Sequence, residues 1–240
     1  MSIILERKSQ ISIPVLKEQH GQFFQGPTID TRDSLIEFVQ LMQIYNGAMK
    51  TVSAKLEVLD DEFQVSYKHN PIHHLECRLK RPQSIYEKLQ KIGRLLSVGE
   101  ARQNILDIAG IRVICNFTDD IYTVEKLLLQ HPDVTLINRK DYIEKPKENG
   151  YRSLHLVVQV PVFLTGRTEE VPVEIQLRTI AMDYWASLEH MLRYKNYDSE
   201  TQKYAAMLLD CANTLAETER TMQYIRENIE DAGGTNNEFN

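Results

Sequence analysis

The sequence has few cysteines and no long apolar run. Its three cysteines, Cys77, Cys115 and Cys211, are odd in number and far apart, which argues against a disulfide framework or a zinc site with paired ligands. No window reaches the length of a membrane-spanning helix, and the charged residues 6–8 interrupt the apolar start where a signal peptide needs its core. We therefore expect a cytoplasmic protein with reduced thiols and no membrane partner.

Several phosphate-binding motifs are also missing. The chain contains no G-x-x-x-x-G-K-[ST] loop and no kinase glycine-rich loop. It also lacks the Gly-Ser followed by Asp-x-Asp that polymerase-β-type nucleotidyltransferases carry. Positive charge is not in excess, because the net charge is -6, and this argues against a stable nucleic-acid partner.

Strict alternation of apolar and polar residues predicts a β-hairpin between residues 151 and 178. The loop around Gly166 turns the chain back. One face of the hairpin is apolar, and the other carries groups that bind metals, phosphates and base edges. The polar residues of that second face are His155, Glu174, Gln176 and Arg178.

The remaining periodicities predict helices around a small sheet. Long helices are expected over about residues 35–63 and 200–230, and shorter ones over 82–96, 100–106, 119–130 and 179–194. Further strands are expected at residues 111–117 and 134–137. In helix 82–96 the expected core face is Ile85, Leu89, Ile92 and Leu96; in helix 179–194 it is Ile180, Trp185, Leu188 and Leu192. His73 and His74 are placed on a helix, where neighbouring side chains point apart.

This order predicts an α/β (α+β) fold, in which a small mixed β-sheet is flanked by helices and long helices stand at both ends. We divide the chain into a flexible arm over residues 1–30, one domain over 31–231 and a disordered tail over 232–240. The seams of the two long helices suit an oligomer.

Residues 78–94 oppose the average charge, with six basic residues against one acid, a local charge of +5. Pro82 suits the first turn of a helix. Lys80 precedes it, and Ser84, Lys88 and Lys91 follow on one side of that helix, where they can line up along a polyphosphate near the helix N-terminus. A solvated lysine face is the alternative, and the pattern leaves both open.

Two isolated carboxylates stand at strand-associated positions. Asp107 precedes one predicted strand and Glu174 lies within another. If these strands are neighbours, the two carboxylates can hold one Mg²⁺, with phosphates and water completing its octahedron. Together with a basic helix and the basic loop over residues 139–150, this predicts phosphoryl-type transfer.

Four motifs, in order, resemble the synthetase domain of the RelA/SpoT family, and the chain is similar to a small alarmone synthetase of the RelP type. The motifs are Arg78-Leu-Lys80 with Ser84 and Lys88, Asp107-Ile-Ala-Gly-Ile-Arg112, Asp141-Tyr142-Ile143 through Asn149-Gly150-Tyr151-Arg152-Ser153-Leu154-His155, and Glu174-Ile-Gln176-Leu-Arg178-Thr179. The resemblance covers about residues 40–225 and implies a nucleotidyltransferase-like synthetase fold.

The resemblance implies transfer of the β,γ-pyrophosphate of ATP to the ribose 3′-OH of GDP or GTP, giving ppGpp or pppGpp and AMP. It implies that Asp107 and Glu174 hold Mg²⁺ and that Glu174 accepts the 3′-OH proton. The ATP-binding residues would be Arg78, Lys80, Ser84, Lys88, Lys91 and Arg112. The acceptor-binding residues would be Lys147, Tyr151, Arg152, His155 and Gln176, with Tyr151 stacked on the guanine.

The resemblance also implies a homotetramer built through the terminal helices. The chain has no His-Asp dipeptide, so no hydrolase activity is expected. It also lacks the regulatory extensions of the long enzymes of the family, so we expect no sensing of ribosomes. Two other functions stay open: the same chemistry on another acceptor, such as an adenine nucleotide or a tRNA 3′ end, and a catalytically inactive nucleotide or RNA sensor.

Overall fold

The computed structural model describes residues 32–195 and 201–234. Contacts divide the chain into two compact units. The first contains the chain up to Gln43 and the segment Lys80–Ile105, and the second contains Ile44–Leu79 and the chain from Leu106 onward. The predicted arm over residues 1–30 lies outside the described residues, as do residues 235–240 of the predicted tail.

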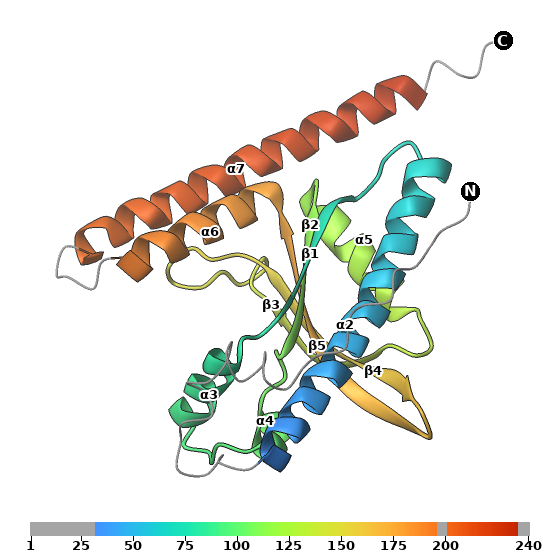
Figure 1. The fold of residues 1–240 in the computed structure, drawn as a ribbon. Coiled ribbons are helices and arrows are strands. Elements are labelled where there is room, and N and C mark those ends of the chain that lie inside the picture. Colours follow the sequence, from blue (N-terminus) through green and yellow to red (C-terminus); the bar gives the residue numbers. More distant parts are fainter. Residues whose placement is uncertain (1–31, 196–200, 235–240) are drawn as a thin grey trace. The chain divides into compact units, whose positions relative to one another are not determined.

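The second unit is built on one mixed sheet of five strands (Figure 1). Their order across the sheet is β1-β2-β5-β4-β3. Strands β2 and β5 are parallel, and the other neighbouring pairs are antiparallel. The predicted small mixed sheet is therefore confirmed. The strands are β1 (Ile72–Leu79), β2 (Ala109–Cys115), β3 (Thr135–Asp141), β4 (Leu154–Leu164) and β5 (Arg167–Thr179).

One face of this sheet is apolar and the other is polar, as the alternation in the hairpin predicts. Over residues 154–162 of β4 and 171–177 of β5, buried residues alternate with half-buried ones. Helix α5 (Thr118–Leu129) buries Ile121, Val124 and Leu128. Helix α2 (Arg32–Ser66) approaches β4 closely, because a Cβ on Gly47 would lie 3.0 Å from Val162 Cγ1. Burial of the apolar face leaves the polar face for chemistry.

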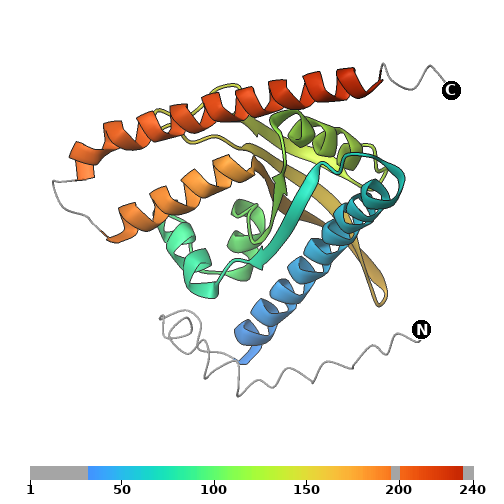
Figure 2. The same ribbon diagram turned by 90° about the horizontal axis from the view of Figure 1, so that it is seen from above.

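Two helices follow the sheet at the C-terminal end of the chain. Helix α6 (Ile180–Lys195) continues directly from β5, and α7 (Thr201–Gly234) packs alongside it (Figure 2). The indole Nε1 of Trp185 in α6 donates to the carbonyl oxygen of Leu208 in α7 at 2.8 Å. Residues 232–234, expected in the tail, are the last residues of α7. None of the described helices combines the length and apolar character needed to cross a lipid bilayer.

Two local predictions of secondary structure are wrong. Residues 72–79 form strand β1, so His73 and His74 lie on a strand and not on a helix. The helix predicted over 82–96 is α3 (Pro82–Lys91), followed by α4 (Val98–Asn104). It ends early because Gly93, at φ +69°, takes the left-handed conformation that closes a helix, and Arg94 N–H donates back to Leu89 C=O.

The early end of α3 changes which of its residues are buried. Ile85 and Leu89 are buried as predicted, but Ile92 lies beyond the helix and is 45% exposed. In α6, Ile180 and Leu192 are each 48% exposed, while Met182, Trp185 and Ala186 are buried. The inward face of α6 is thus rotated from the predicted one.

Candidate active site

A pocket open to solvent lies where strands β1, β2 and β5 run side by side. In the sheet register Arg78 lies opposite Gly110, and Gly110 lies opposite Glu174. Four of the predicted site residues therefore line one pocket. The residues that line it are Glu76, Cys77, Arg78, Gly110, Ile111, Arg112, Glu174 and Gln176.

The central strand β5 supplies the middle of the polar face. Its apolar residues Val173, Ile175 and Leu177 are fully buried. Glu174 and Gln176 lie between them and point to the other side. The amide Nε2 of Gln176 donates to Glu174 Oε2 at 3.0 Å, so the carboxylate is held in place by its own strand.

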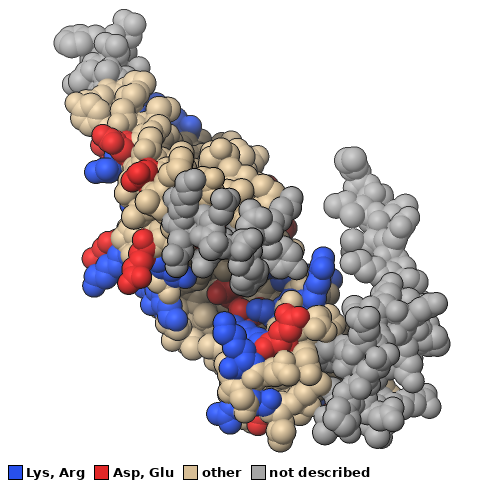
Figure 3. All heavy atoms as spheres, turned by 90° about the vertical axis from the view of Figure 1, so that its left-hand side faces the viewer, with Lys and Arg blue, Asp and Glu red and all other residues tan. Residues whose placement is uncertain are grey.

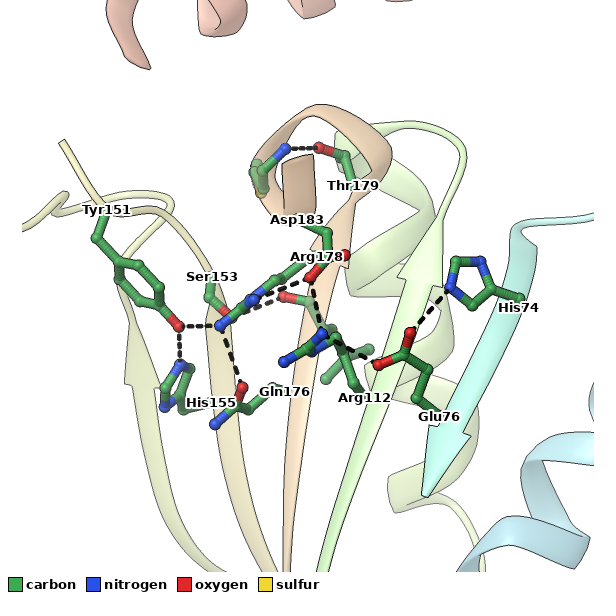
Figure 4. Close-up of polar contacts among 12 residues, drawn as sticks. His74, Glu76, Arg112, Tyr151, Ser153, His155, Gln176, Arg178, Thr179 and Asp183 are labelled. Atoms are coloured by element: carbon green, nitrogen blue, oxygen red, sulfur yellow. Dashed lines mark hydrogen bonds and ion pairs between the residues drawn. The ribbon is translucent and has the colours of Figure 1, made fainter. Parts of the chain in front are cut away.

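Arg178, the next residue on this face, is the hub of a polar network that the sequence did not reveal (Figure 4). Its side chain is buried, and Nη1 donates to Asp183 Oδ1 at 2.9 Å. Nη2 donates to the hydroxyl of Tyr151 at 2.7 Å and to Gln176 Oε1 at 3.2 Å. The alternation places Arg178 on the polar face, but its partner Asp183 stands in the first turn of the following helix.

Arg112 in β2 joins this network from the other side. Its Nη1 donates to Glu76 Oε2 at 3.0 Å and lies 3.2 Å from Asp183 Oδ1 (Figure 4). Arg112 and Arg178 therefore share one carboxylate oxygen. This sharing fixes two guanidinium groups across neighbouring strands, because a charged hydrogen bond is stronger than a neutral one.

The polar face is close to electrically balanced. Three guanidinium groups, of Arg78, Arg112 and Arg178, stand against three carboxylates, of Glu76, Glu174 and Asp183. Basic and acidic side chains are also interspersed on the face of the molecule that Figure 3 shows. A polyphosphate bound at the pocket thus needs additional positive charge.

Tyr151 lies at one end of the network, beside the rings of Tyr142 and His155 and the ammonium of Lys147. Its hydroxyl is 2.7 Å from Nε2 of His155. The ammonium of Lys147 lies 4.6 Å from the centre of the Tyr142 ring and 4.7 Å from that of Tyr151, within cation–π range. The Asn149 side chain donates to Glu189 in α6. The predicted acceptor residues Lys147, Tyr151 and His155 are thus brought together.

His155 is neutral in this site. Burial, and then the positive charges of Arg178, Lys147 and Lys140, lower the pKa of His155 to about 4. Because Arg178 donates to the Tyr151 hydroxyl, that hydroxyl directs its own proton to His155 Nε2. The ring proton then sits on Nδ1, which faces Glu174 Oε1 at 3.8 Å.

Neither the pocket nor the polar network of the second unit includes five of the predicted site residues. Arg152 directs its guanidinium away from the pocket, with Nη1 3.1 Å from the carbonyl oxygen of Ala212 in α7. The other four, Lys80, Ser84, Lys88 and Lys91, belong to the first unit. Their contact with ATP stays a prediction.

The predicted metal ligands are both in the second unit. Asp107 lies in the turn that leads into β2, and Glu174 lies on the neighbouring strand β5. Both are half-buried carboxylates, and their oxygens are the hard ligands that Mg²⁺ takes together with substrate phosphates. The donor chemistry of this pair therefore fits Mg²⁺. Among the described residues, no cluster of three or more His, Cys, Asp or Glu side chains could hold a metal.

Comparison with known proteins points to one family. The family described as the region found in RelA / SpoT proteins matches residues 77–199. The GTP pyrophosphokinase YwaC of Bacillus subtilis is 38% identical over 201 residues, which cover 84% of this chain and 96% of that protein.

Solved structures of small alarmone synthetases share the fold. The structure of small alarmone synthetase 1 from Bacillus subtilis, bound to its product pppGpp, superposes with a TM-score of 0.74 at 33% identity. The superposed region covers 80% of this chain and 97% of the chain in that structure. Small alarmone synthetase 2 from the same organism gives a TM-score of 0.70 at 41% identity, covering 78% of this chain and 97% of that one.

Proposed function

The chain belongs to the family of RelA/SpoT proteins, and we propose on this premise that it is a GTP pyrophosphokinase. It would transfer the β,γ-pyrophosphate of ATP to the ribose 3′-OH of GDP or GTP, giving ppGpp or pppGpp and AMP. The observation that carries the proposal is the pocket in which Glu174 and Arg78 flank Gly110 on three adjacent strands. This pocket thus places a carboxylate that can accept a proton beside a cation that can contact ATP.

Glu174 is the group best placed to take the proton of the acceptor hydroxyl. As the 3′ oxygen forms its bond to the β phosphorus, the bond from that phosphorus to the α–β bridging oxygen breaks, AMP leaves, and the proton passes to Glu174. Gln176 donates to one oxygen of this carboxylate and the Nδ1–H of His155 faces the other. These contacts orient the base before the substrate arrives.

Asp107 and Glu174 would hold Mg²⁺, which when bound neutralises the charge of the ATP phosphates. Because the three guanidinium groups of the polar face are balanced by carboxylates, further cations are needed to bind ATP. We assign this role to Lys80, Lys88 and Lys91, with Ser84 as a hydroxyl donor. Arg78 and Arg112 would contact the ATP from the sheet.

The acceptor would bind on the Tyr151 side of the network. The Tyr151 ring would stack on the guanine, while Lys147, His155 and Gln176 would orient the ribose and phosphates. Arg178 holds both the Tyr151 hydroxyl and the Gln176 amide. We therefore add Arg178 to the site as a positioning residue that fixes two acceptor contacts at once.

We also propose a homotetramer assembled through the terminal helices. Helices α6 and α7 expose large apolar side chains, including Tyr184 at 60%, Met207 at 60% and Ile229 at 66%. Exposed apolar side chains along two packed helices are typical of subunit contacts. Light scattering after size-exclusion chromatography would give about four times the mass of 27.9 kDa if the proposal holds, and a monomer mass would refute it.

A chromatographic assay tests the function. Purified protein is incubated with ATP and Mg²⁺ and, in turn, with GMP, GDP, GTP, ADP and a deacylated tRNA. We expect guanosine tetra- or pentaphosphate together with an equal amount of AMP. AMP formed only with ADP or tRNA would establish a different acceptor, and no AMP under any condition would favour an inactive sensor.

A further inference from the structure

Arg152 ties the loop that carries Tyr151 to the middle of helix α7. Its Nη1 donates to the carbonyl oxygen of Ala212 at 3.1 Å, and its Nη2 donates to Asn213 Oδ1 at 3.3 Å. Nη1 also lies 3.4 Å from the carbonyl oxygen of Gly150 in its own loop. A carbonyl oxygen has two lone pairs, so the Ala212 carbonyl can accept from Arg152 as well as from its helix.

The backbone of the same loop is fitted to the same turn of α7. A Cβ on Gly150 would lie 2.6 Å from the Ala212 Cβ and 3.1 Å from Leu209 Cδ1. Gly150 is buried and has φ +90°, a conformation that L side chains rarely adopt. The loop can therefore approach α7 this closely only because residue 150 has no side chain.

Tyr151 stands between these two contacts and faces the site. Its ring packs against the buried cluster of Trp185, Ala186 and Ala212. Its hydroxyl reaches Arg178 and His155. The orientation of the ring thus depends on a wall that α7 helps to build.

A second attachment holds α7 near the end of β5. The half-buried carboxylate of Glu219 lies close to the side chain of Thr179, which lowers the pKa of that carboxyl against the rise that burial causes. Thr179 is the last residue of β5, one residue after Arg178. Helix α7 therefore contacts both the acceptor loop and the strand that carries the network.

We propose that Arg152 is a positioning residue, which fastens the acceptor loop (residues 147–152) to helix α7 and so holds Tyr151 in the orientation that binds the acceptor base. This inference rests on the proposed function. It replaces a direct contact between Arg152 and the acceptor, because the guanidinium is engaged by a helix carbonyl and an asparagine.

Kinetics of R152M separate the two roles. If Arg152 acts through α7, the variant raises the acceptor KM about tenfold, as expected for the loss of one charged hydrogen-bonded group. The kcat and the KM for ATP should stay within about twofold, and the effect should be equal for GDP and GTP. A matched charge loss at the hairpin tip, R167M, should leave all constants unchanged, because Arg167 is exposed and pairs only locally with Glu169.

Changes on the α7 side test the same contact without touching the acceptor. A212V pushes against Gly150 and should reproduce the rise in acceptor KM, and its effect should not multiply with that of R152M. N213A removes only the weaker of the two bonds from an exposed position, so it keeps the test open if A212V fails to fold. N213A should raise the acceptor KM by about two- to threefold.

Trp185 is the only tryptophan of the chain and gives a readout that needs no turnover. It is buried and its indole nitrogen is bonded to α7. R152M should therefore shift its emission to longer wavelength, and R167M should not. This measurement remains informative even if the protein makes no alarmone.

Three results would overturn the proposal. One is an R152M effect that is larger with GTP than with GDP while A212V and N213A behave as wild type, which would show direct contact with the acceptor phosphates. Another is an unchanged acceptor KM in R152M. The third is a Trp185 emission in R152M that is indistinguishable from wild type.

Discussion

Gly150→Ala is the sharpest test of how closely helix α7 fits the acceptor loop. At φ +90° an alanine brings backbone strain of roughly 1–2 kcal/mol. Its Cβ would also stand 2.6 Å from the Cβ of Ala212, which is fixed to the helix backbone and cannot rotate away. Overpacking of this kind costs about 1–3 kcal/mol. The free energy of unfolding should thus fall by about 2–5 kcal/mol in total.

Gly166 provides the matched control. It has nearly the same backbone angle, φ +86°, but nothing lies within 4 Å of a Cβ placed there. Gly166→Ala should therefore show the backbone strain alone. The difference between the two variants measures the contact with α7.

A second change should rescue the first. Ala212→Gly removes the opposing Cβ, although a glycine inside a helix costs about 1 kcal/mol by itself. In the double variant the contact between the Cβ atoms of residues 150 and 212 is absent. The loss of stability of the double variant should therefore be smaller than the sum of the two single losses by about 1–3 kcal/mol.

Urea unfolding followed by Trp185 fluorescence and circular dichroism gives these free energies, and the acceptor KM should follow the same order of variants. The close packing of α7 against the acceptor loop would be refuted if Gly150→Ala destabilised the protein no more than Gly166→Ala. Simple additivity in the double variant would refute it as well.

Three further predictions concern the network. Glu174→Gln keeps the bond to Gln176 but removes the proton acceptor, so kcat should fall by about 10²–10³-fold or more while the melting temperature changes little; activity within tenfold of wild type would remove Glu174 from its role. His155 should titrate near pH 4 by NMR, with its signal identified by comparison with H155N. Because the folded pKa of about 4 lies below the unfolded value of 6.5, the free energy of unfolding should fall by about 3 kcal/mol as the pH drops from 6.5 through 4. A midpoint at pH 6 or above would contradict the buried, neutral ring. Asp183→Asn leaves Arg112 and Arg178 without their shared charge and should cost about 1.5–3 kcal/mol, whereas the exposed Asp210→Asn should cost almost nothing; equal stability of the two variants would show that Asp183 is dispensable.

The polar face was predictable because its information is local. Alternation along β5 separates Glu174 and Gln176 from the buried residues beside them, and the structure keeps this separation. Arg178 lies on the same polar face but is itself buried. The position of β5 between β2 and β4 then brings Arg112 and His155 to the same row as Gln176. The alternation along a strand thus predicts which residues share a face of the sheet. The pairing of the strands then determines which residues of the neighbouring strands lie beside them.

The missed features depend on distant or weak signals. Strand β1 is an edge strand whose residues are mostly exposed, so it shows little apolar alternation from which to predict it. The partner of Arg152 lies 60 residues further along the chain. A hydrogen bond to a helix carbonyl leaves no mark on residue types, because every residue has a carbonyl.

Helix α7 carries an apolar seam that its own chain leaves largely exposed. The seam residues Tyr204, Met222, Ile225 and Ile229, which the sequence predicts to suit an oligomer, are 43–66% exposed. The residues that dock α7 within the chain are Ala212, Glu219 and Arg226, which contact Arg152, Thr179 and Asp119.

These docking residues recur every seven positions, so they share one side of the helix, about 10 Å apart along its axis. A stripe of small and polar residues therefore attaches α7 to its own chain by specific hydrogen bonds. The apolar stripe beside it is left exposed, as expected for a surface that meets another subunit. Docking by polar bonds keeps α7 in register over the acceptor loop, which an apolar seam alone would specify poorly because hydrophobic contact is not directional.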